Sequence, residues 1–122
     1  MTVGEMKAYL EWRGQEELWL IIENKTEADT ELQALRIIVR WQQSEKAGAW
    51  KPYPMLIGPR MTFRLNVAHL ARTVVEAELP QVPAEKTMDL AAELYTGAAE
   101  TLRSESFPVK YDGVKAAFGP AL

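Results

Sequence analysis

Cysteine is absent from the 122 residues of this chain, and this excludes disulfide bonds, thiolate nucleophiles and most structural zinc sites. Histidine occurs once, as His69, so no pair of histidines can hold a metal ion. No serine lies in a G-x-S-x-G turn, and neither a glycine-rich phosphate loop nor an Asp-rich calcium loop is present. We therefore expect a protein that is not an enzyme, with no catalytic residue, metal or cofactor.

Positive charge is sparse as well. Lys and Arg number 14 against 17 Asp and Glu, and no basic run exceeds two residues, so binding to a nucleic-acid backbone is not expected. No apolar run approaches the roughly 20 residues that cross a membrane. The first residues show no basic segment followed by an apolar one, so we expect no signal peptide and synthesis in the cytoplasm.

The first half of the chain alternates between apolar and polar residues, a period typical of β-strands. Enrichment in β-branched and aromatic residues supports the same interpretation. The alternating segments are 5–14, 16–26, 31–43 and 61–67. Residues 49–61 carry three prolines, which cannot donate to a sheet ladder, so this segment is expected to be an edge strand or an extended loop.

Residues 67–79 fit two structures. In a helix, one side would be apolar, made of Val67, Leu70, Ala71, Val74 and Ala77. In the last part, TVVEAEL also alternates as a strand does. A short helical turn near 67–73 that leads into a strand and one longer helix are both compatible with this pattern.

Residues 87–109 are rich in Ala, Leu and Glu, which favours a helix locally. A helix would, however, expose Leu90 and Leu94 and place Gly97 in its middle at a cost of about 1 kcal/mol. A strand would instead put both leucines on one face. We therefore predict a hairpin, with a strand over 87–95, a turn over 96–100 and a closing strand over 101–109.

Seven or eight strands in a chain of this length predict an all-β fold of two packed sheets. LWLIIENKT resembles the second strand of many immunoglobulin-like domains, and ELPQVPAEKTMDLAAELYTG with ETLRSESFPVKY resembles their last two strands. The resemblance spans residues 5–111 and implies one β-sandwich domain over 1–111, followed by an apolar arm over 112–122. The alternative is an α+β domain.

Several residues are candidates for contact with a partner. Trp19 and Ile21 lie opposite the main apolar face of their segment, and Ile38 lies between Arg36 and Arg40. Trp and Arg are enriched in interface hot spots. Either these positions contact another molecule, or the chain covers them itself.

Two further groups are apolar where a loop or tail would be polar. Trp50 and Tyr53, in the proline-rich segment, would stack on a sugar, dock on a protein or close one end of the sandwich. Phe118 and Leu122 belong to an apolar tail, which is expected to pack against this domain or a neighbouring molecule.

These features predict a structural or interaction subunit of a larger assembly, with protein partners that are copies of the chain or assembly neighbours. One such context is a phage or virus particle, as a decoration, tail or neck protein. The first alternative is a carbohydrate- or peptide-binding module. The second is an α+β domain with an acidic active site, although the pairs Glu76/Glu78 and Asp89/Glu93 are typical of a solvated sheet face.

Overall fold

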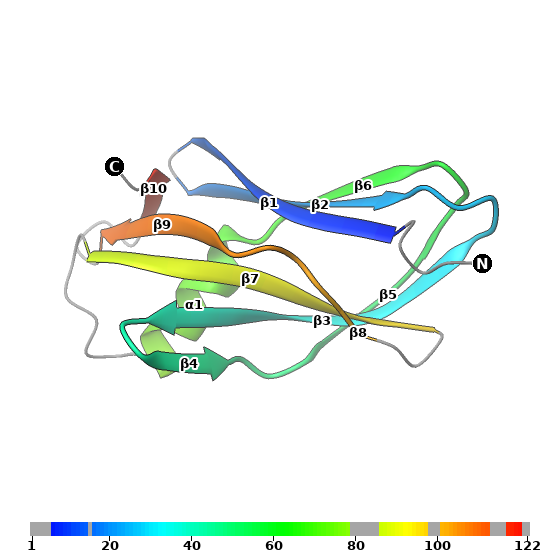
Figure 1. Ribbon diagram of the computed structural model, residues 1–122. Helices are drawn as coiled ribbons and strands as arrows, with labels where there is room; N and C mark the ends of the chain where they lie inside the picture. The colour runs from blue at the N-terminus through cyan, green and yellow to red at the C-terminus, as the bar shows by residue number, and fades with distance from the viewer. Residues whose placement is uncertain (1–5, 15, 79–85, 98–100, 113–116, 121–122) are drawn as a thin grey trace.

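The computed structural model describes residues 6–14, 16–78, 86–97, 101–112 and 117–120. Two antiparallel sheets pack face to face, with one helix beside them (Figure 1). The small sheet has the order β1 (Met6–Gly14), β2 (Glu17–Asn24), β6 (Thr62–Asn66). The large sheet has the order β10 (Ala117–Pro120), β9 (Phe107–Asp112), β7 (Lys86–Thr96), β3 (Thr30–Trp41), β4 (Ser44–Ala47), with β5 (Lys51–Ile57) on β3 and β8 (Thr101–Arg103) on β7.

This arrangement confirms the predicted two-sheet β-sandwich. The first, second and sixth strands form one sheet, while β3, β7 and β9 form the middle of the other, as strands A, B and E and strands C, F and G do in immunoglobulin-like domains. The described residues hold ten strands, more than the seven or eight expected. Beyond six expected strands, β4, the proline-rich segment and the tail each contribute one, and the closing strand is divided in two.

The proline-rich segment is an edge strand, one of the two structures expected for it. β4 and β5 both pair with the side of β3 that β7 leaves free. Between them, the Gly48 N–H donates to the Ile37 carbonyl at 2.9 Å, which keeps the interrupted edge attached to β3. Pro52 and Pro54 remove two N–H donors from this edge and so weaken its capacity to pair with a further strand.

Residues 68–78 form one helix, α1 (Ala68–Glu78), so of the two structures compatible with the sequence pattern the longer helix is the one that forms. Asn66 accounts for the start of the helix, because its Oδ1 accepts from the Ala68 N–H at 3.0 Å, as an N-cap side chain does. The residues that it buries are Val67, Ala68, Ala71, Val74 and Val75. Ala77, placed on the apolar side by the sequence pattern, is exposed, because the buried stripe turns toward Val75.

Residues 87–96 lie in a strand, as predicted, and the α+β alternative that required a helix here is wrong. The closing strand is interrupted between β8 and β9, and at this point Ser104 hydrogen-bonds to the backbone of Ala92 on β7. Its N–H donates to the Ala92 carbonyl at 2.8 Å and its Oγ accepts from the Ala92 N–H at 2.9 Å. Ser104 is 5% exposed, so these bonds satisfy backbone groups that water does not reach.

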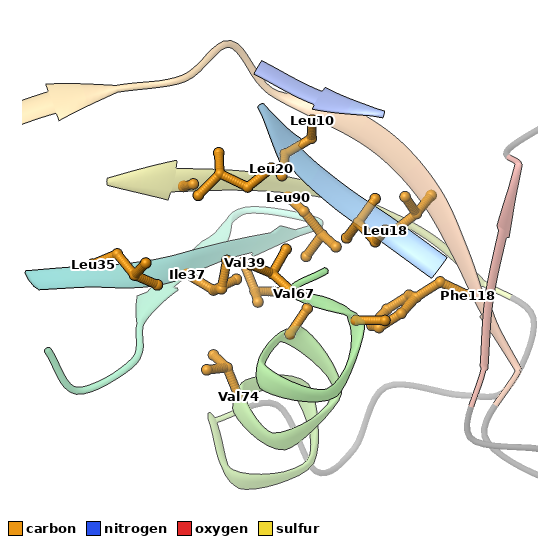
Figure 2. Close-up of a cluster of buried hydrophobic side chains, with 14 of the residues drawn as sticks. Leu10, Leu18, Leu20, Leu35, Ile37, Val39, Val67, Val74, Leu90 and Phe118 are labelled. Carbon is orange, nitrogen blue, oxygen red and sulfur yellow. The ribbon is translucent and has the colours of Figure 1, made fainter. Parts of the chain in front are cut away.

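The core lies between the two sheets and the helix. Figure 2 shows Leu10, Leu18 and Leu20 of the small sheet opposite Leu90, Ile37 and Val39 of the large one. Val67 and Val74 point from the helix toward the same cluster, so α1 covers inner surface of the large sheet that the small sheet leaves free. At the edge, the Trp12 Nε1–H donates to the Phe118 carbonyl at 2.9 Å and links β1 to β10.

Candidate functional site

The outer face of the large sheet holds four of the nine predicted contact residues, Arg36, Ile38, Arg40 and Trp50. Its centre is an ion pair between Arg36 on β3 and Glu93 on β7, which are partners in the strand register. Arg36 Nη2 lies 2.6 Å and its Nε 2.8 Å from Glu93 Oε1. Glu93 is 9% exposed, and a carboxylate this buried requires such a partner.

Arg103 on β8 extends this pair into a network across four strands. Its Nε lies 3.7 Å from Glu93 Oε2, and its Nη1 lies 3.6 Å from Glu45 Oε2 on β4. Glu45 in turn accepts from Arg40 Nη2 at 2.8 Å. The hydrogen bond from Arg40 lowers the pKa of the Glu45 carboxyl, and the same contact raises the pKa of Arg40.

The network accounts for Ile38, which sequence analysis placed on a solvent face. Ile38 pairs with Ala91 in the strand register. Both residues lie between the two carboxylates that Arg103 joins, Glu93 on β7 and Glu45 on β4. Arg103 thus bridges the two carboxylates on the outer face, beside Ile38. Ile38 is 3% and Ala91 4% exposed, so the chain itself covers them. Ile38 is not an exposed contact residue.

Trp50 is held beside this network. The Arg36 guanidinium lies 4.4 Å from the centre of the Trp50 ring, a cation–π contact. Tyr95 meets the same ring edge-on, at 6.1 Å between centroids. Trp50 remains 37% exposed, so a fixed indole is presented to solvent.

Tyr53 does not share a platform with Trp50. Its ring lies 6.0 Å from that of Phe63 on β6, and both rings pack against the core. Tyr53 therefore helps to close the sandwich between the edges β5 and β6. This is the closing role that sequence analysis considered for the segment, and the aromatic partner of Trp50 is Tyr95 instead.

An exposed apolar stripe continues from Trp50 along β5. Alternate residues of the strand face outward, and Leu56, the last of them, is 64% exposed. We call this set the β5 stripe; it consists of Trp50, Pro52, Pro54 and Leu56. Sequence analysis missed Leu56, although its spacing of two from Pro54 was a sufficient signal.

The outer face of the small sheet holds Trp19 and Ile21. Trp19 is partly exposed, and its Nε1–H donates to Glu17 Oε1 at 3.2 Å. Ile21 lies between its register partners Tyr9 and Arg64 and is 2% exposed. A contact role for Ile21 would require an exposed side chain, and the side chain of Ile21 is buried.

The apolar tail packs on its own domain over the described residues. Phe118 is 2% exposed, and its ring lies 5.2 Å from that of Tyr111. Residues 117–120 thus form a strand that pairs with β9, and Phe118 is a core residue. Leu122 lies outside the described residues.

The acidic and polar candidates have structural partners. Glu76 accepts from the Tyr111 hydroxyl at 2.9 Å, and this bond ties α1 to β9. Asn24, in a glycosylation sequon, is 1% exposed and its Nδ2 donates to three carbonyls, including Ile57 at 3.0 Å, so it fixes two turns. Within the described ranges, no three His, Asp or Glu side chains are grouped as metal ligands would be.

None of the helical structure in the described part of the chain has the length and apolar character needed to cross a membrane. No family model and no curated protein matches the sequence. Among solved structures, the chain is similar to an X-ray structure described as Northeast Structural Genomics Consortium target SoR45, at 10% identity and a TM-score of 0.44, over 84% of this chain and 81% of that one. A likeness of this degree carries no argument about function.

Proposed function

We propose that this protein is a structural or interaction subunit that contacts a second copy of itself through the outer face of the large sheet. The observation that carries the proposal is the β5 stripe, in which Trp50 and Leu56 are two of the three large hydrophobic residues that are clearly exposed in the described residues. Exposed apolar residues grouped on one face are typical of protein contact sites.

The charges beside the stripe favour a copy of the chain as the partner. The ion-pair network beside the stripe, together with Asp89 next to Arg40, has three cations and three anions: Arg36, Arg40, Arg103, Glu45, Asp89 and Glu93. A two-fold contact brings the same patch of both copies together. A face with balanced charge meets itself without net repulsion, whereas a face of one sign would not.

The rigidity of Trp50 supports the same role. Arg36 and Tyr95 hold the indole before any partner arrives, so little side-chain entropy is lost when it is buried. Trp and Arg are also the residues that most often dominate interface energetics. A virus or phage particle, in which small subunits repeat, is one setting for such a contact.

Sedimentation velocity over a range of concentrations up to about 1 mM tests the proposal. We expect concentration-dependent self-association of the unchanged chain, weakened at least tenfold by Trp50→Ala or Leu56→Ala. Met61→Ala is the matched control, because Met61 is 58% exposed but lies in the turn before β6. A monomer at every concentration, or equal effects of all three variants, would contradict the proposal.

A second candidate function is carbohydrate binding at Trp50. The exposed, fixed indole with Tyr95 at its edge is the observation that favours it, since sugars stack on such rings. Quenching or enhancement of tryptophan fluorescence by a panel of oligosaccharides, lost in Trp50→Ala and kept in Trp19→Ala, would support this function. An unchanged spectrum with every sugar would remove it.

A further inference from the structure

A cleft of about 410 Å³ opens between β1 of the small sheet and β8 of the large one. This volume is within the range of sites that bind ligands. Four consecutive residues of β1, Met6 to Tyr9, form one wall. Because successive side chains of a strand point to opposite faces, a cavity that touches all four must border the edge of the strand.

That edge of β1 is free in the described part of the chain. β1 pairs with β2 from Met6↔Asn24 onward, and no other described strand pairs with it. Its backbone N–H and C=O groups on the cleft side are thus open to a further strand. The opposite wall is formed by Leu102, Arg103 and Glu105, from β8 and the residues after it.

The other half of the same side is already closed by an extended segment. β10 pairs with β9, and the Trp12 indole near the far end of β1 bonds to the Phe118 carbonyl. Figure 1 shows β10 at one end of the sandwich and β8 toward the other. The described chain therefore closes one half of this side with a strand and leaves the cleft in the other half.

We propose that the cleft binds an extended peptide segment of another protein, which pairs with the free edge of β1. Inward side chains of this peptide would meet Met6, Ala8 and Leu102, so aliphatic or aromatic residues fit at alternate positions. The charged residues at the rim balance, with Lys7 and Arg103 against Glu23 and Glu105, so the intervening positions are neutral. This site is separate from the β5 stripe and does not depend on the proposed self-association.

The probes are acetylated and amidated pentapeptides Thr-X-Thr-X-Thr, with X as Val, Leu or Phe, titrated to about 1 mM into the ¹⁵N-labelled full chain. We expect shifts at the amides of Met6 to Tyr9 and at Leu102 and Arg103, with slowed hydrogen exchange at alternate β1 amides. Two further peptides are N-methylated, one at both X residues and the other at all three Thr residues. Only one set of N–H groups faces β1 in an added strand, so one of the two should lose binding and the other keep it.

Leu102→Ala is expected to weaken binding about tenfold, because it removes apolar surface from the cleft. Met61→Ala, an exposed apolar residue that neither lines the cleft nor belongs to the β5 stripe, is the matched control and should bind as the unchanged chain does. Met6→Ala gives a second test of the cleft wall if Leu102→Ala unfolds. The proposal is overturned if no peptide shifts these amides or if both N-methylated peptides bind as well as the parent peptide. It is also overturned if the shifts appear without peptide as the protein concentration rises, because a second copy of the chain would then be the occupant of the cleft.

Discussion

Helix and sheet approach each other closely at Gly48, and this gives a sharp prediction. A Cβ built on Gly48 would lie 2.6 Å from Val74 Cγ2 and 3.4 Å from Val74 Cγ1, so Gly48→Ala forces α1 and the β4–β5 edge apart. Gly48 has no positive φ, so the backbone accepts alanine. Alanine would stabilise the fold by about 0.4–1 kcal/mol through the unfolded state, whereas overpacking costs about 1–3 kcal/mol. We expect a net loss of about 1–2 kcal/mol.

The double variant with Val74→Ala isolates the clash. Val74→Ala alone removes two buried methyl groups and should cost about 2 kcal/mol. With both changes the new methyl occupies space that Val74 has left, so the total loss should be about 1–2 kcal/mol and not the roughly 3–4 kcal/mol of the sum. Urea unfolding followed by circular dichroism measures all three free energies.

The control for this cycle is Gly119→Ala, because a Cβ at Gly119 meets no atom within 4 Å. It should leave the free energy of unfolding within about 0.5 kcal/mol of the unchanged chain. The prediction is contradicted if the losses in free energy of unfolding from Gly48→Ala and Val74→Ala add, to within about 0.5 kcal/mol, in the double variant. Val74 would then not be the residue that excludes a side chain at position 48.

Other predictions concern buried polar groups and the surface network. Ser104→Ala should lower the free energy of unfolding in urea by about 1–3 kcal/mol, since the buried Ala92 N–H loses its acceptor. Asn24→Ala should cost a similar ~1–3 kcal/mol, measured in the same way. An NMR titration should place the pKa of Glu45 below its ordinary value of 4.5, and Arg40→Gln should return it toward that value. Because this pKa is lowered by folding, the stabilisation from Glu45 is present above the unfolded-state pKa and is lost as pH falls through the folded one.

The strands and their sheets follow from alternation in the sequence, since a face that is apolar at every second residue has one way to be buried. The prediction of a strand over 87–95 was correct. A strand buries both Leu90 and Leu94, and this burial outweighs the local helix propensity. At 67–79 the same reasoning did not decide, because both patterns fit. The cap at Asn66, which depends on where β6 ends, selects the helix.

The candidate site was less predictable, because exposure depends on partners distant in the chain. Ile38 is buried beside an ion-pair network that Arg103 of β8 completes, and nothing in the sequence near Ile38 indicates this. Phe118 lies in the core because β10 pairs with β9, a contact that an apolar tail alone does not specify. Trp50 is exposed, and its aromatic partner Tyr95 comes from β7, far along the chain.

Proline limits the size of any assembly that the large sheet can build. One margin of that sheet is formed by β4 and β5, with Pro52 and Pro54 in β5, and the other ends in β10, with Pro120. A chain of molecules joined margin to margin would need continuous backbone ladders, and each proline interrupts one. Fibre-like growth is thus opposed on both sides. If two copies meet through their outer faces, the pair is closed by its symmetry and further growth requires a different surface.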